Sequence, residues 1–374
     1  MREIPLPLPG RDDSYRILVG PGLSRDLGRL LLPLKLPPRI FVISDRTVAR
    51  LYGQTALKAL QAGGYQAELL TVPPGERSKT WGVVQRLSRE LLTRGATRQT
   101  LLIPLGGGVV GDFTGFLASI YLRGVPCVQV PTTLLAMVDA AIGGKTAINL
   151  PEGKNLLGTF HQSRLVIIDP EFLDTLPAKE RRNGLAEVVK AAFIRDPELL
   201  GRLERSRGRI FADREELTEV ICRAAAIKAR VVAADVHEAG KRRILNFGHT
   251  LGHALEQASG FRLPHGRAVA LGMLAALHLS QRLAGLSAAE AERGRRLIHG
   301  LGLARRPPRP DAGKVLAALP RDKKRRGDDL VFVLLKRLGE PVVMEGVPLP
   351  LVAEALEMVI GGGKAGRGGP TPTS

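Results

Sequence analysis

The chain has 374 residues, more than one hydrophobic core usually organises, and this length suits two domains. Hydrophobic residues make up 44% of it, which excludes general disorder. No apolar run reaches the ~18 residues that span a bilayer, and residues 1–10 lack the layout of a signal peptide. We therefore expect a soluble, cytoplasmic protein with no membrane partner.

The formal net charge of +19 indicates an anionic partner, either nucleic acid or a small phosphorylated acid. The basic residues are scattered, apart from one dense run over 321–326, and aromatic residues make up only 4%. No helix-turn-helix or zinc-finger spacing is present. We predict a solvated basic surface and no specific nucleic-acid partner. Cys127 and Cys222 are predicted to be inert, reduced thiols.

The first half of the chain alternates short apolar segments with segments of helical spacing. Strands are predicted at 39–45, 67–72, 100–105, 125–130 and 165–168, and helices at 47–63 and 78–94. Repeated alternation of this kind is typical of a parallel sheet covered by helices. We predict an α/β domain with a Rossmann-like parallel sheet over residues 1–178.

The second half has a different texture. Helical periodicity runs over 179–258 and 267–301, and only 330–335 and 342–345 are strand-like, which predicts a small hairpin. Residues 179–360 are therefore predicted to form a mainly α-helical domain, and the Gly/Pro-rich residues 361–374 a disordered tail. A cleft between two such domains is a usual place for a ligand site.

A glycine-rich segment follows the predicted strand at 100–105. Gly106, Gly108 and Gly111 satisfy G-x-G-x-x-G before a predicted helix, where free N–H groups bind a pyrophosphate. No acidic residue follows about 20 positions later, as the dinucleotide fingerprint requires. Asp45, at the end of an earlier strand, is an alternative ribose partner. The pattern also fits a plain strand–helix turn.

Hydroxyl, acid and lysine side chains gather in the next segment. Pro131-Thr132-Thr133 is followed by Asp139 and by Gly-Gly-Lys-Thr over 143–146. The upstream glycine of a nucleotide-triphosphate loop is missing, so an ATPase is not expected. The residue types fit a phosphate or a cofactor, and a surface loop is the alternative.

A third cluster has the composition of a metal site. Glu187 and Lys190 share a helix face, and His249 and His253 lie one turn apart, with His265 shortly after. A carboxylate with two or three imidazoles suits zinc or a similar ion and leaves coordination positions open. Histidines buried in a core are the alternative.

The order of these motifs resembles the 3-dehydroquinate synthase family of sugar phosphate cyclases. The motifs are Pro-Gly-Glu-x-x-Lys, Gly-Gly-Gly-Val-x-Gly-Asp, Pro-Thr-Thr, Asp-x-x-x-Gly-Gly-Lys-Thr, Glu-x-x-Lys, Asn-Phe-Gly-His-Thr and His-Gly. They extend over about residues 39–345. The resemblance implies a lyase that binds NAD and one divalent metal ion, Zn or Co. It would convert 3-deoxy-D-arabino-heptulosonate 7-phosphate to 3-dehydroquinate and phosphate through transient oxidation, elimination, reduction, ring opening and aldol closure. The family also implies a homodimer.

The resemblance implies a role for each matching residue. The metal ligands would be Glu187, His249 and His265. The NAD site of the first domain would include Asp45, Glu76, Lys79, Gly107, Gly108, Val109, Asp112, Thr132, Thr133, Lys145, Lys154, Phe172 and Thr175. The substrate phosphate would meet Arg123, Lys145, Asn155 and His253. The carboxylate and hydroxyls would meet Lys190, Lys228, Arg242, Asn246 and either Lys323 or Lys324. Asp139 would bind a hydroxyl or the nicotinamide end. Catalytic roles would fall on Lys190, Asp139, His253, Asn246, Arg242 and Lys228.

Arg267 departs from the family pattern, which has Glu after His-Gly, and it places a cation two residues from His265. Two other enzymes remain open: a sibling cyclase that makes an inosose or a valiolone, and an NAD-dependent polyol dehydrogenase. The substrates of the sibling cyclases lack a carboxylate, so Lys228 and Arg242 favour the dehydroquinate reaction.

Overall fold

The computed structural model describes residues 1–8, 14–206, 208–304, 310–319 and 330–361. Its contacts divide the chain into two compact units. The first contains Met1–Val188 and Arg209–Arg242, and the second contains Val189–Gly208 and Arg243–Ser374. This division differs from a boundary at residue 178, because helix α8 (Arg214–Ala234) packs with the first unit and contacts strands β1 and β2.

A seven-stranded sheet is the centre of the first unit, with strand order β1-β2-β9-β6-β5-β3-β4. Every neighbouring pair is parallel except β1 with β2. The strands are β1 (Arg2–Leu6), β2 (Tyr15–Val19), β3 (Arg39–Asp45), β4 (Gln66–Val72), β5 (Thr100–Gly106), β6 (Val128–Pro131) and β9 (Leu165–Ile168). The predicted parallel α/β sheet is confirmed.

Three parts of this unit differ from the expected strands. The segment 125–130 forms only the short strand β6, and β1 and β2 were not predicted. Strand β1 contains Pro5, which a sheet accepts at its edge, where the missing N–H leaves no partner unbonded. The motif segment after residue 144 forms a separate antiparallel hairpin of β7 (Lys145–Leu150) and β8 (Gly153–Phe160).

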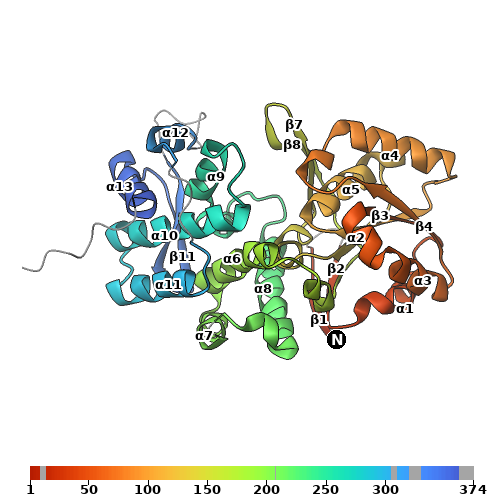
Figure 1. The fold of residues 1–374 in the computed structure, drawn as a ribbon, viewed down its shortest axis with the longest axis horizontal. Coiled ribbons are helices and arrows are strands. Elements are labelled where there is room, and N and C mark those ends of the chain that lie inside the picture. Colours follow the sequence, from red (N-terminus) through yellow and green to blue (C-terminus); the bar gives the residue numbers. More distant parts are fainter. Residues whose placement is uncertain (9–13, 207, 305–309, 320–329, 362–374) are drawn as a thin grey trace, which may run out of the picture. The chain divides into compact units, whose positions relative to one another are not determined.

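Helices pack against the sheet through their apolar faces, which bury the apolar side chains of the strands. Helices α4 and α5 lie side by side (Figure 1), and Leu87 and Phe113 join Phe41 and Leu102 in one core. The helices of this unit are α1 (Leu27–Leu31), α2 (Arg46–Val48), α3 (Gln54–Ala62), α4 (Trp81–Thr93), α5 (Gly108–Ile120) and α8. A π-helical turn, Ala49–Gly53, joins α2 to α3.

Helix α6 (Ala178–Arg195) carries the chain from the first unit into the second. The second unit is built around α10 (His265–Leu283), which contacts α9, α11, α13 and β10. Its other elements are α7 (Pro197–Ser206), α9 (His249–Ala258), α11 (Ala288–Gly300), α12 (Ala312–Ala317), α13 (Leu349–Ile360) and the hairpin of β10 (Phe332–Arg337) with β11 (Glu340–Met344).

The long helical stretch 179–258 is divided into four helices. Pro197 begins α7, because a proline ring cannot continue the hydrogen-bond ladder of α6. Gly208 and Gly248, which lie before α8 and α9, have positive φ angles that interrupt the helical backbone. The predicted hairpin of the second half is confirmed. The predicted tail after Gly361 lies outside the described residues. Among the described residues, no helix is long and apolar enough to cross a membrane.

Candidate active site

The parallel strands run in the order β4-β3-β5-β6-β9, so the direction of winding reverses between β3 and β5. In open α/β sheets, ligands bind beyond the carboxyl ends of the strands at this reversal. Asp45 ends β3, and Gly106 ends β5. The tertiary structure therefore brings the predicted acid and the glycine-rich turn to neighbouring strand ends.

The turn between β5 and α5 is closely packed at its glycines. A Cβ on Gly106 would lie 2.7 Å from the Val110 side chain, and one on Gly107 would lie 3.1 Å from Thr133 Cγ2. Helix α5 has no side-chain N-cap, so its first N–H groups face the turn. The buried Thr132 donates its N–H to Gly106 O at 2.9 Å. Its Oγ1 is buried without a hydrogen-bond partner among the described residues. The turn thus offers free N–H donors and a hydroxyl to an anionic group.

Predicted residues of the NAD and phosphate sites meet around Lys79. The buried Lys79 ammonium donates to Asp112 and to Asn155. Asn149 donates to Glu76 at 2.7 Å. Burial raises the pKa of Asp112 to about 6, against the opposing effect of Lys79. A pair in which a carboxyl titrates near neutrality is the kind of polar cluster that functional sites use.

The other side chains predicted for the cofactor occupy two further places. The Asp45 carboxylate caps α2 by accepting the N–H groups of Thr47 and Val48 at 2.8 and 3.1 Å. Thr175 Oγ1 lies 2.6 Å from the hydroxyl of Tyr52, whose ring packs edge-on against Phe172. Tyr52 was missed because a single tyrosine in a helical stretch gives no motif.

A second group of polar residues surrounds Gly143. Lys228 donates to Asp139 at 2.5 Å. The Gly143 N–H donates to the hydroxyl of the buried Tyr15 at 2.9 Å, and burial raises the pKa of that hydroxyl to about 12. Arg242 is 1% exposed, and its Nη1 donates to Val236 O at 3.0 Å and Gly143 O at 3.4 Å. Arg242 therefore supports the Gly143 turn and does not face solvent.

Backbone packing places His249 and His265. Both are the first residues of their helices, α9 and α10. A Cβ on Gly272 of α10 would lie 1.9 Å from Gly248 O, so the turn before His249 rests directly on α10. Only glycine permits this approach, and the approach fixes the starts of the two helices beside each other.

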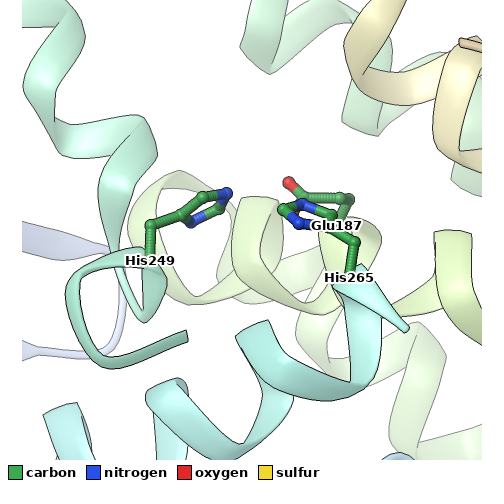
Figure 2. Close-up of side chains that lie close together, drawn as sticks. All are labelled: Glu187, His249 and His265. Atoms are coloured by element: carbon green, nitrogen blue, oxygen red, sulfur yellow. The ribbon is translucent and has the colours of Figure 1, made fainter. Parts of the chain in front are cut away.

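Glu187 completes this group from helix α6. Further along α6, Phe193 packs edge-on against Phe247, with ring centroids 6.1 Å apart, which holds the helix beside the start of α9. Glu187, which is 2% exposed, His249 and His265 each offer one ligand atom, and these atoms lie within 4.8 Å of one another. Figure 2 shows the three side chains pointing toward a common place. Two imidazoles and a carboxylate form the donor set of a mononuclear site with open positions.

Further contacts orient the two imidazoles. His249 Nδ1 lies 3.3 Å from Phe247 O, and His265 Nδ1 lies 3.2 Å from the buried carboxylate of Glu256. A contact of this kind at one ring nitrogen orients the ring so that its other nitrogen can ligate an ion. Glu256 was missed, although the spacing His249-x-x-x-His253-x-x-Glu256 puts all three on one helix face. Glu256, His253 and His265 form an overlapping group of possible ligands.

The remaining predicted residues are more dispersed. Lys190 is buried on α6, one turn after Glu187, and Asn246 is exposed. Arg123 is exposed, in a turn where its φ is 69°, and makes no hydrogen bond or ion pair with another described residue. Lys154 lies half-buried in β8. Lys323 and Lys324 lie outside the described residues.

Known proteins share both the sequence and the fold. Residues 69–183 match the N-terminal part and 184–325 the C-terminal part of 3-dehydroquinate synthase. The 3-dehydroquinate synthase of Nostoc punctiforme is 42% identical over 92% of this chain and 97% of its own length.

Two solved structures have similar folds. A 2-epi-5-epi-valiolone synthase from Streptomyces hygroscopicus subsp. jinggangensis, with NAD⁺ and Zn²⁺ bound, is 32% identical with a TM-score of 0.84 and covers 93% of this chain and 97% of its own. A 2-deoxy-scyllo-inosose synthase complexed with carbaglucose-6-phosphate, NAD⁺ and Co²⁺ is 26% identical with a TM-score of 0.86 and covers 96% and 99%. Family matches over most of the chain and full-length relatives above 40% identity lead to one conclusion: the chain belongs to the 3-dehydroquinate synthase family.

Proposed function

We propose that this protein converts 3-deoxy-D-arabino-heptulosonate 7-phosphate to 3-dehydroquinate and phosphate. Membership of the 3-dehydroquinate synthase family supports the reaction, and the group of Glu187, His249 and His265 carries the chemical argument. The substrate has a carboxylate and a phosphate, which lysine and arginine side chains bind.

The residues fit both an NAD molecule and a divalent ion. The glycine turn, the free N–H groups of α5 and the buried Thr132 hydroxyl suit a pyrophosphate at the reversal point of the sheet. Glu187, His249 and His265 suit a zinc or cobalt ion. When bound, NAD supplies a reversible hydride acceptor and the metal ion a Lewis acid for the hydroxyl that is oxidised.

The side chains of this chain then hold the substrate in place. Lys228, fixed by Asp139, is proposed to bind the carboxylate, and Lys145 with Asn155 the phosphate. Lys190, next to Glu187 on the same helix face, is proposed to meet a hydroxyl. The departing phosphate can itself take the neighbouring proton, so the protein mainly supplies position and charge. His253, Asn246, Arg123 and a lysine at 323 or 324 remain proposed substrate contacts.

The enzyme is further proposed to be a cytoplasmic homodimer. The side chains of Leu156 and Phe160 are 59% and 44% exposed and lie four residues apart on strand β8, so they point to the same face of the β7–β8 hairpin. Exposed apolar side chains on one face support a contact with a second copy. Free Cys127 and Cys222 agree with a reducing compartment. Sedimentation of the wild type and of Leu156→Asp tests the dimer, because an interface across this hairpin weakens when Leu156 is charged.

The test of the reaction is to incubate the purified protein with the substrate, NAD⁺ and Zn²⁺ or Co²⁺, and to measure phosphate and dehydroquinate. Equal amounts of both, lost on chelation and without net NADH, are expected. Glu187→Gln and His249→Ala should lose turnover and metal while keeping the fold. Net NADH with a polyol would instead indicate a dehydrogenase, and turnover only of a sugar phosphate that lacks a carboxylate would indicate a sibling cyclase.

A further inference from the structure

The loop that follows helix α8 folds back so that several of its backbone N–H groups donate to one carboxylate, that of Asp235. Asp235 caps the end of α8, and its Oδ1 accepts the N–H of Ala239 at 2.8 Å. Its Oδ2 accepts the N–H groups of Gly240 at 2.8 Å and of Arg242 at 2.9 Å. These backbone donors, led by Arg242, lower the pKa of Asp235 to about 2. The carboxylate is therefore ionised near neutral pH, where it accepts all three N–H groups.

The closed loop carries a side chain to the Gly143 turn. Arg242 directs Nη1 at Gly143 O, and a Cβ on Gly143 would lie 2.7 Å from Arg242 Nη2. The preceding peptide group of the same residue is held by Tyr15, whose hydroxyl accepts the Gly143 N–H. Gly143 has φ 99°, a conformation that glycine adopts without strain. Arg242 thus binds the backbone of a turn that lies two residues before Lys145.

The same loop carries a second side chain to Lys145 itself. Glu238 pairs with the Lys145 ammonium, and its own φ is 59°. A glutamate is uncommon in the left-handed region and is strained there, so the surrounding contacts must impose this conformation. Asp235 accepts the N–H groups of Ala239 and Gly240, the two residues after Glu238, and so fixes the backbone next to it.

We infer that Asp235 is a positioning residue, whose carboxylate holds Arg242 against the Gly143 turn and Glu238 against Lys145. This inference rests on the proposed function, in which Lys145 binds the substrate phosphate. Asp235 itself touches no substrate. It acts on the reaction through the two side chains that its loop presents.

The comparison of Asp235→Asn with Asp213→Asn tests this role. Asp213 also accepts two backbone N–H groups, of Glu215 at 2.9 Å and Glu216 at 3.0 Å, but it caps the start of α8 and contacts neither Arg242 nor Lys145. Asparagine keeps the size of either residue and replaces one acceptor by a donor. Both variants are expected to lose stability, and only Asp235→Asn is expected to raise the substrate KM and lower kcat/KM, by about ten- to a hundredfold.

A double-variant cycle separates positioning from general stabilisation. Because Asp235 works partly through Arg242, Asp235→Asn should lower kcat/KM several-fold less in an Arg242→Lys background than in the wild type. Equal effects in both backgrounds, or an unchanged KM in Asp235→Asn, would overturn the inference.

A measurement without turnover keeps the inference separate from the proposed reaction. In hydrogen exchange of the protein without ligands, Asp235→Asn should speed exchange of the Gly143 amide, and Asp213→Asn should not. Unchanged Gly143 exchange in Asp235→Asn would contradict the positioning role whatever the substrate is. A wild type that shows this coupling and yet fails to turn over the heptulosonate phosphate would overturn only the proposed reaction.

Discussion

Asp112 lies at the start of helix α5 and shares the ammonium of Lys79 with Asn155. Its pKa of about 6 in the folded protein exceeds the value of about 3.9 in an unfolded chain. Between these values the folded state binds a proton that the unfolded state does not. This contribution to the unfolding free energy is therefore present at about pH 4 and is lost as the pH rises through 6.

The corresponding prediction concerns Asp112→Asn. Without NAD, the unfolding free energy of the wild type should fall between pH 4.5 and 7 by more than that of the variant, because asparagine does not titrate. Urea unfolding at the two pH values measures both. Parallel pH profiles for the two proteins would show that Asp112 does not carry this dependence.

Glu256 is the buried carboxylate that contacts His265. Replacing a carboxylate of this kind beside a ligating histidine weakens metal affinity, because the ring loses its orientation and basicity. Glu256→Gln is expected to lower the affinity for Zn²⁺ about 10- to 100-fold, measured by competition with a chelator. Glu354→Gln is the matched control. Glu354 Oε1 lies 3.0 Å from Nε2 of His278, a histidine that is not a proposed metal ligand. Equal losses in both variants would argue against a specific role for Glu256.

Helix α6 shows how a glycine fixes the position of a proposed metal ligand. A Cβ on Gly184 would lie 2.4 Å from Leu135 N and 2.6 Å from Leu134 Cβ, so α6 meets this segment backbone to backbone. Glu187 follows one turn later on the same helix. The close approach at Gly184 therefore fixes the backbone position from which the Glu187 side chain extends.

Gly184→Ala tests this contact against the intrinsic preference of helices for alanine. The variant is expected to lose about 1–3 kcal/mol of unfolding free energy, because the added methyl group forces the two backbones apart. Gly82→Ala in α4 is the control, because nothing lies within 4 Å of its Cβ position, and it should gain up to about 1 kcal/mol. Urea unfolding measures both. A stabilised Gly184→Ala protein would contradict the close approach.

The chain passes between its two units three times, after Val188, Gly208 and Arg242. Helix α8 belongs to the first unit although it follows residues of the second. It buries Leu217, Val220 and Ile221, and its Glu219 pairs with Arg2 of the edge strand β1. The first unit is therefore incomplete without a segment that lies far along the chain.

A fragment ending at residue 178 should for this reason lack a cooperative unfolding transition and bind a hydrophobic dye, whereas a fragment ending at 242 should retain one. Circular dichroism during urea unfolding distinguishes the two outcomes. Cooperative unfolding of the shorter fragment would show that residues 1–178 form a domain by themselves, as the sequence pattern predicts.

Features that depend on neighbouring residues of the chain could be predicted before the structure was known. Alternating apolar segments predicted β3, β4, β5 and β9, because buried parallel strands are continuous apolar runs. Motif order indicated the family, and residue type indicated a donor set for a metal ion. The strands, the motifs and the donor types each depend on residues that are close in the chain, so their spacing and residue types can be seen directly in the sequence.

The packing of the folded chain determines which distant residues meet. It put Asp45 and Gly106 on adjacent strand ends, joined α8 to the first unit, brought Glu256 to His265, and closed the Asp235 loop on Arg242. Strand order, backbone approach at glycines and the pairing of buried charges depend on packing between segments far apart in sequence. No local periodicity encodes them, because they arise only when the apolar faces of the elements are buried together.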